Sequence, residues 1–141
     1  MRALTFEMTI PQRPAIEGAA LGAPAVVLRL EGALAMTAAA VAYAQVGQGW
    51  LVFAALFLVP DLSMLGYLAG RRIGATAYNA GHSYLLPAAL GAAGMAGHLP
   101  MLVGAALIWV AHIGFDRMLG YGLKYASGFG DTHLGRKGGA K

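Results

Sequence analysis

The sequence contains no cysteine, and only 11% of its 141 residues are charged. Without cysteine the chain can form no disulfide, no thiolate metal site and no cysteine nucleophile. An average soluble domain carries about 25% charged residues, so the scarcity of charge argues against a water-soluble fold. The sequence also lacks a G-x-S-x-G motif, a phosphate-binding loop and a zincin motif, which removes several common enzyme classes.

Apolar and small residues dominate instead. Hydrophobic residues make up 58% of the chain, and the mean hydropathy is +0.62. The 21 glycines suit closely packed membrane helices, because small residues let helix backbones approach. The formal net charge of +4 could indicate nucleic acid, but the basic residues are scattered at the ends of apolar segments. This is how membrane proteins use them. We therefore expect one compact membrane domain and no nucleic-acid partner.

The apolar segments predict an all-α fold, a polytopic membrane protein built as a four-transmembrane-helix bundle. Each segment has about 20 residues, the length that a helix needs to cross a bilayer. Pro60-Asp61 interrupts the second segment, where proline removes a backbone hydrogen bond and kinks the helix. The predicted spans are about 25–46, 50–70, 73–95 and 101–120 of a transmembrane domain (25–120), between an N-terminal cytoplasmic tail (1–24) and a C-terminal cytoplasmic tail (121–141).

Lysine and arginine predict the orientation, because cytoplasmic loops carry an excess of these residues. With four spans and both termini inside, all ten fall on the cytoplasmic side, and the turns near Gly47 and His98 have none. The sequence thus predicts a multi-pass inner-membrane protein. The ten are Arg2, Arg13, Arg29, Arg71, Arg72, Arg117, Lys124, Arg136, Lys137 and Lys141.

Ionisable residues recur at one depth of the predicted bundle. His112 and Asp116 are four residues apart and share a helix face. Asp61 precedes Arg71 by ten residues and His82 follows Arg72 by ten, so both lie roughly 15 Å from the cytoplasmic interface. Ionisable side chains inside a membrane are costly and by default suggest a functional site. We therefore expect these helices to share one polar site in the cytoplasmic half of the bilayer.

Two imidazoles and two carboxylates can complete the shell of a divalent metal such as Zn, Mn, Fe or Mg. The predicted ligands are Asp61, His82, His112 and Asp116. A metal with an open position can activate water for hydrolysis, with Glu31 or Asp61 as the general base. Arg117, with Arg29 and Lys124, would bind an anionic group of the substrate.

Structural interpretations of the same residues stay open. His112 with Asp116 could be a buried ion pair that locks helices together, and Asn79, which shares a face with His82, could join helices by hydrogen bonds. Arg29 and Glu31 could form a positioning pair near the interface. His133 could fold back under the bundle as a further ligand or remain solvated in the tail.

Several motifs resemble a known family. PDLSMLGYLAG, YNAGHSYLLP and AHIGFDRMLGYGLKYASGFGDTHLG are similar to the signature blocks of a bacterial family of small four-helix membrane proteins of unknown function. More distantly, Pro60-Asp61, His82-Ser83 and His112 with Asp116 resemble the motif order of the YdjM-like membrane-bound metal-dependent hydrolases. The early Thr-His and the His-Arg-Gly of those hydrolases are absent here. This resemblance implies a bacterial cell-membrane location and a metal-dependent hydrolase.

Two main functions follow as hypotheses. The first is a metal-dependent hydrolase whose substrate is a membrane lipid or another amphipathic molecule. The alternative is a non-catalytic accessory subunit that packs against a larger membrane complex or another copy of itself, with its polar residues joining helices. A small carrier fits less well, because transporters need a polar path across both halves of the bilayer. Haem bound between His82 and His112 ranks behind a divalent metal.

Overall fold

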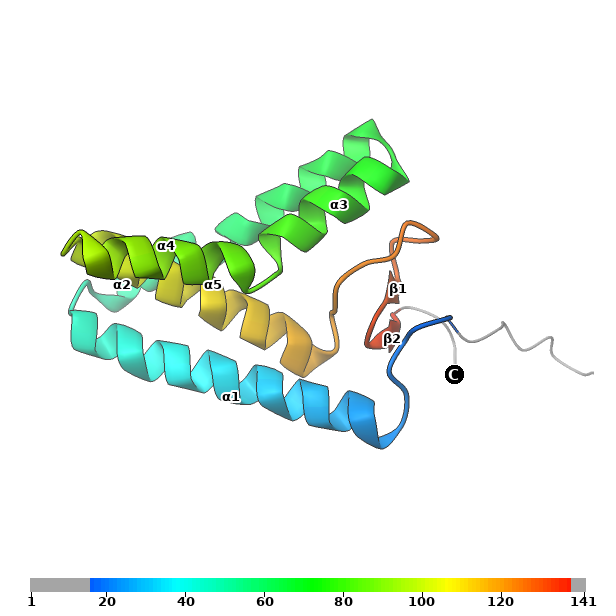
Figure 1. Ribbon diagram of the computed structural model, residues 1–141, viewed down its shortest axis with the longest axis horizontal. Helices are drawn as coiled ribbons and strands as arrows, with labels where there is room; N and C mark the ends of the chain where they lie inside the picture. The colour runs from blue at the N-terminus through cyan, green and yellow to red at the C-terminus, as the bar shows by residue number, and fades with distance from the viewer. Residues whose placement is uncertain (1–15, 138–141) are drawn as a thin grey trace, which may run out of the picture.

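The computed structural model describes residues 16–137, and the chain there is mostly helical (Figure 1). Predictions about residues 1–15 and 138–141 concern positions outside this range. The elements are α1 (Ala23–Val46), α2 (Trp50–Leu56), the 3-10 helix η1 (Val59–Ala69), α3 (Arg71–Gly81), α4 (Leu85–Ala96), α5 (Pro100–Leu119), β1 (Asp131–Thr132) and β2 (Gly135–Arg136).

The longest helices, α1 and α5, lie side by side and run in opposite directions (Figure 1). The start of α1 and the end of α5 lie at the same end of the molecule (Figure 1). Arg29 Nε donates to Met118 O at 3.0 Å and joins the two helices at this end.

Two glycines allow the close contact between α1 and α5. A Cβ at Gly32 would lie 2.8 Å from Gly114 O, and a Cβ at Gly114 would lie 2.6 Å from both Gly32 O and Met36 N. Backbone therefore meets backbone at this crossing, as small residues permit in membrane helices. The contact fixes how α5, and with it His112 and Asp116, sits against α1.

The second predicted span is broken as its proline requires. A proline ring clashes with the carbonyl four residues earlier, which for Pro60 is that of Leu56. The α-helix α2 ends at Leu56, and the chain resumes as η1 from Val59. The break places Asp61 in the first turn of η1, beside the interior of the molecule.

The predicted third span (73–95) is not one continuous helix. The chain bends at residues 82–84, between α3 and α4, and Figure 1 shows the two helices pointing in different directions. The physical cause is again a proline, because Pro87 would clash with the carbonyl of Ser83 in a continuous helix. Pro87 instead lies in the first turn of α4, where its missing N–H costs little. His82 thereby becomes the residue that ends α3.

The structure is mostly helical, as expected, and adds a folded segment after α5 where the sequence predicted a C-terminal tail. Helix α5 ends at Leu119, and Gly120 (φ 86°) follows it in a Schellman motif, with Tyr121 N donating to Asp116 O at 2.8 Å. The following segment, 121–137, folds into loops and a short antiparallel pair, β1 with β2. Hydrogen bonds hold this segment against α3, so it is part of the fold. Hydropathy does not predict such a segment, because hydrogen bonds to its backbone, which hydropathy does not record, hold it in place.

Three helical stretches are long and apolar enough to cross a membrane: α1, Trp50–Ala69 and α5. Large apolar side chains point outward along the helices, for example Leu51 (85% exposed) and Leu68 (88% exposed). Among the polar side chains, His82 and His112 are buried. Apolar outside and polar inside is the reverse of a soluble domain and fits a membrane protein.

Candidate metal centre

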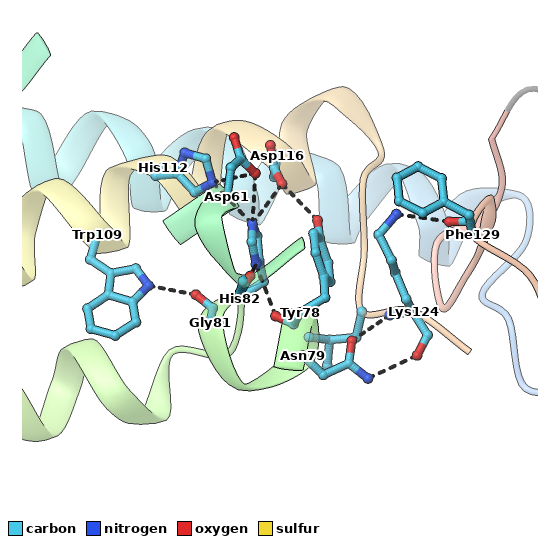
Figure 2. A network of polar contacts seen from close by, with 12 residues as sticks. Asp61, Tyr78, Asn79, Gly81, His82, Trp109, His112, Asp116, Lys124 and Phe129 are labelled. Carbon is cyan, nitrogen blue, oxygen red and sulfur yellow. Dashed lines mark hydrogen bonds and ion pairs between the residues drawn. The ribbon is translucent and has the colours of Figure 1, made fainter. Parts of the chain in front are cut away.

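Four ligand-type side chains from three segments meet inside the molecule (Figure 2). Asp61 comes from η1, His82 from the end of α3, and His112 and Asp116 from α5. Each offers one ligand atom, and these atoms all lie within 4.8 Å of one another. The structure thus brings together the four residues expected to bind metal, and we call them the Asp/His cluster.

Distances within the Asp/His cluster are short. His82 Nε2 lies 3.2 Å from His112 Nε2, 3.4 Å from Asp61 Oδ1 and 3.5 Å from Asp116 Oδ2. His112 Nε2 lies 3.6 Å from Asp61 Oδ1. Ligands around a tetrahedral ion with bonds of 2.0–2.1 Å are separated by about 3.3 Å, so the observed spacing suits a small cation. The group could hold a metal ion.

The surroundings of His82 orient its ring. Its Nδ1 lies 3.0 Å from the carbonyl oxygen of Tyr78, which can only accept a hydrogen bond. Nδ1 must therefore carry the proton, and in the neutral ring Nε2 turns its lone pair to the Asp/His cluster. The ring also stacks on Tyr78 with centroids 3.7 Å apart. A hydrogen bond that fixes the tautomer in this way is typical of metal-binding histidines.

His112 is the most enclosed member, with 1% of its surface exposed. Its ring packs edge-on against Phe57, and its buried Nδ1 has no hydrogen-bond partner among the described residues. The 3.2 Å between the two Nε2 atoms leaves no room for a haem iron and its ring. Asp61 is the most accessible, with 38% of its side chain exposed. The site is closed on the His112 side and open at Asp61.

Tyr78 links α3 to the carboxylate of α5. Its hydroxyl donates to Asp116 Oδ2 at 2.9 Å, and its ring supports His82. Tyr78 was not among the predicted site residues. Its position four residues before His82, on the same face of the helix, is the sequence signal that could have identified it.

We expect Tyr78→Phe to weaken metal binding about 10-fold to 100-fold, the usual effect of removing a hydrogen bond that orients a metal ligand, here Asp116. The phenyl ring preserves the stacking on His82, so the change isolates the hydroxyl. Competition with a chelating dye, in detergent, measures the dissociation constant. Equal affinity in both proteins would show that the hydroxyl does not hold Asp116 for a metal.

The C-terminal segment covers the Tyr78 side of the site (Figure 2). Asn79 holds it by two bonds, from its Nδ2 to Lys124 O at 2.9 Å and from Lys124 N to its Oδ1 at 2.6 Å. Lys124 is 6% exposed, and its Nζ donates to Phe129 O and lies 4.6 Å from the centre of the Tyr78 ring. Burial lowers the pKa of Lys124, and the negative charges of Asp116 and Asp61 oppose that shift. Asn79 thus joins α3 to the C-terminal segment, and not to another helix.

Other predicted site residues lie outside the Asp/His cluster. Glu31 is on an exposed part of α1 and is not among the four clustered residues. Arg29 caps the end of α5, and the Arg117 guanidinium lies 4.3 Å from the centre of the Tyr84 ring.

His133 belongs to the C-terminal segment rather than to the Asp/His cluster. Its Nδ1 accepts a hydrogen bond from Leu123 N at 2.8 Å. Burial, followed by the charge of Arg117, lowers the pKa of His133. The residue is half-buried, so it is neither a fifth member of the cluster nor a fully solvated tail residue.

Comparison with known proteins identifies a family without an activity. Residues 25–137 match the family described as a domain of unknown function (DUF4260). The match covers most of the chain, which therefore belongs to this family. No curated protein and no solved structure matches. The comparisons give no support to the similarity with YdjM-like hydrolases.

Proposed function

We propose that this member of the DUF4260 family is a membrane-embedded, metal-dependent hydrolase of a lipid-like or amphipathic substrate. The observation that supports it is the convergence of two imidazoles and two carboxylates on one point inside apolar helices. A bound divalent ion such as Zn, Mn, Fe or Mg would activate water and polarise an ester or phosphoester. Ionisable side chains inside a membrane cost free energy, and holding helices together does not require four of them.

The exposed fractions of the four side chains suggest which of them would hold the ion and which would act as the general base. His82, His112 and Asp116 have side chains 3%, 2% and 17% exposed, and they would hold the ion. Three protein ligands and an open position are the usual arrangement of a catalytic site. Asp61, 38% exposed, can reach the open side and would remove a proton from the attacking water.

Arg117 is the proposed contact for an anionic part of the substrate. It follows Asp116 in the last turn of α5, and its guanidinium stacks on Tyr84. A guanidinium held on an aromatic ring keeps its N–H donors available for a phosphate or carboxylate. The exposed position of Glu31 makes Asp61 the better candidate for the base.

We also propose an inner-membrane location with both termini in the cytoplasm. The start of α1, the end of α5 and the C-terminal segment lie at one end of the molecule. Arg29 and Lys137 both bond carbonyls at the end of α5, Met118 O and Leu119 O respectively. Cations gathered at one end favour the cytoplasmic side.

An accessory subunit remains the second candidate, because residues at the site also bond one element to another. Tyr78 joins α3 to α5 through Asp116, and Asn79 joins α3 to the C-terminal segment. Interhelical bonds of this kind hold membrane bundles together without any catalytic role.

Hydrolysis by metal-loaded protein in detergent tests the first candidate. The probes are p-nitrophenyl palmitate and bis(p-nitrophenyl) phosphate, an ester and a phosphodiester. We expect chelator-sensitive hydrolysis of one probe, and a loss of about 100-fold or more in Asp61→Asn, the effect of removing a general base. Asp61→Asn should retain the metal that His82, His112 and Asp116 hold. Metal-loaded wild type without activity on either probe would favour the accessory subunit.

A further inference from the structure

An apolar cavity of about 440 Å³ adjoins the Asp/His cluster. This volume is in the range of small-ligand pockets, roughly 300–1,000 Å³. Among its lining residues the polar side-chain groups are the Ser63 hydroxyl and the indole N–H of Trp109. The lining residues are Leu56, Val59, Pro60, Ser63, Gly81, Leu86, Leu90, Ala105, Ile108 and Trp109.

The cavity is built from the segments that supply the Asp/His cluster. Pro60 precedes Asp61, Gly81 precedes His82, and Trp109 lies one turn before His112 on the same helix. Trp109 Nε1 donates to Gly81 O at 2.6 Å and ties α5 to the end of α3 (Figure 2). Ser63 Oγ lies 3.5 Å from His82 Nδ1. The two helix breaks therefore produce a polar cluster and an apolar cavity side by side.

Physical chemistry limits what can fill this cavity. Water would find few hydrogen-bond partners among these walls. An empty space would forfeit dispersion contacts along its whole lining. Leu56, Val59 and Leu86 line the cavity and are also exposed on the outer surface, which in a membrane faces lipid. A hydrocarbon chain can therefore enter directly from the bilayer.

We propose that the cavity binds the hydrocarbon chain of an amphipathic lipid and places its polar group at the Asp/His cluster. The position of the polar group rests on the proposed hydrolase function, whereas binding of the chain does not. The cavity would select substrates by the chain next to the scissile bond. A hydrolase of this kind would act on long-chain esters or phosphoesters in preference to their short-chain analogues.

Fluorescence of Trp109 reports on the cavity directly. In a Trp50→Phe background Trp109 is the only tryptophan, since the chain has two. The probe is 9,10-dibromostearate, whose bromine atoms quench tryptophan on contact, added to protein in detergent. We expect saturable quenching that reaches its limit near one probe per chain. Quenching that rises without saturation, or no quenching, would overturn the proposal.

Ala105→Phe places a ring in the cavity and should remove at least 90% of the saturable quenching. Ala89→Phe is the matched control, because Ala89 is exposed on α4 and is not among the lining residues. Ala105→Leu, a smaller addition, should reduce quenching in part and decides the matter if Ala105→Phe does not fold. Quenching in Ala105→Leu and Ala105→Phe equal to that of the control would overturn the proposal.

Metal content measured on the same samples separates this inference from the proposed function. Saturable quenching in a protein that binds no metal supports the chain site and contradicts the hydrolase. Metal bound without saturable quenching supports the metal centre and contradicts the chain site. Ala105→Phe with metal retained and quenching lost is the result expected if both are right.

Discussion

His112→Ala is expected to lose the bound metal of the purified protein, which in the wild type should amount to about one ion per chain. Loss of a residue that only orients a ligand costs 10-fold to 100-fold in affinity, so loss of a ligand should cost more than about 100-fold. His112 is 1% exposed and supplies one of two Nε2 atoms 3.2 Å apart, so the variant loses one of the two imidazole ligands. Elemental analysis of detergent-purified protein, after addition of Zn or Mn, makes the measurement.

His98→Asn is the matched control for removal of a histidine. His98 is exposed in the turn between α4 and α5 and has a positive φ of 52°, a conformation that asparagine tolerates. This variant should keep its metal. Metal retained in full by His112→Ala, or absent from the wild type, would contradict the metal centre. That outcome would favour the accessory-subunit hypothesis, and the next step would be to search for a stable partner protein.

Gly114→Ala is expected to destabilise the protein by about 3 kcal/mol, the upper end of the range for overpacking. The added Cβ would lie 2.6 Å from Gly32 O and from Met36 N. These are backbone atoms on both turns of α1 that face Gly114, so no side chain can rotate away. The melting temperature, followed by circular dichroism in detergent, should fall by about 10 °C.

Gly91→Ala is the control, and its expected effect has the opposite sign. Its Cβ would meet Ala106 Cβ at 3.4 Å, close to ordinary contact. Alanine favours a helix over glycine by up to about 1 kcal/mol, so the melting temperature should hold or rise. A Gly114→Ala protein as stable as Gly91→Ala would show that α1 and α5 do not meet backbone to backbone.

The predictions from the sequence were best for the polar residues, because membranes restrict where such residues can go. Asp61, His82, His112 and Asp116 were grouped by depth, by a shared helix face and by ligand chemistry, and the structure brings their ligand atoms within 4.8 Å. Depth follows from the fixed rise of a helix, so it can be counted along the chain. Depth gives no position around the bundle axis, which is why Glu31 and Arg117 were grouped with the site and lie outside the cluster.

The sequence by itself predicted a membrane protein and identified the residues that could bind a metal, since both follow from composition and from one-dimensional spacing. It also determined the break at Pro60, because the clash of a proline is local. Tertiary structure alone decided that His82 turns its Nε2 inward, that Tyr78 holds Asp116, and that the C-terminal segment packs on α3. The apolar cavity beside the cluster also arises only in three dimensions, since its walls come from five separate helical segments, α2, η1, α3, α4 and α5. Contacts between segments far apart in the chain leave no periodic signal, and hydropathy records only the average environment of each segment.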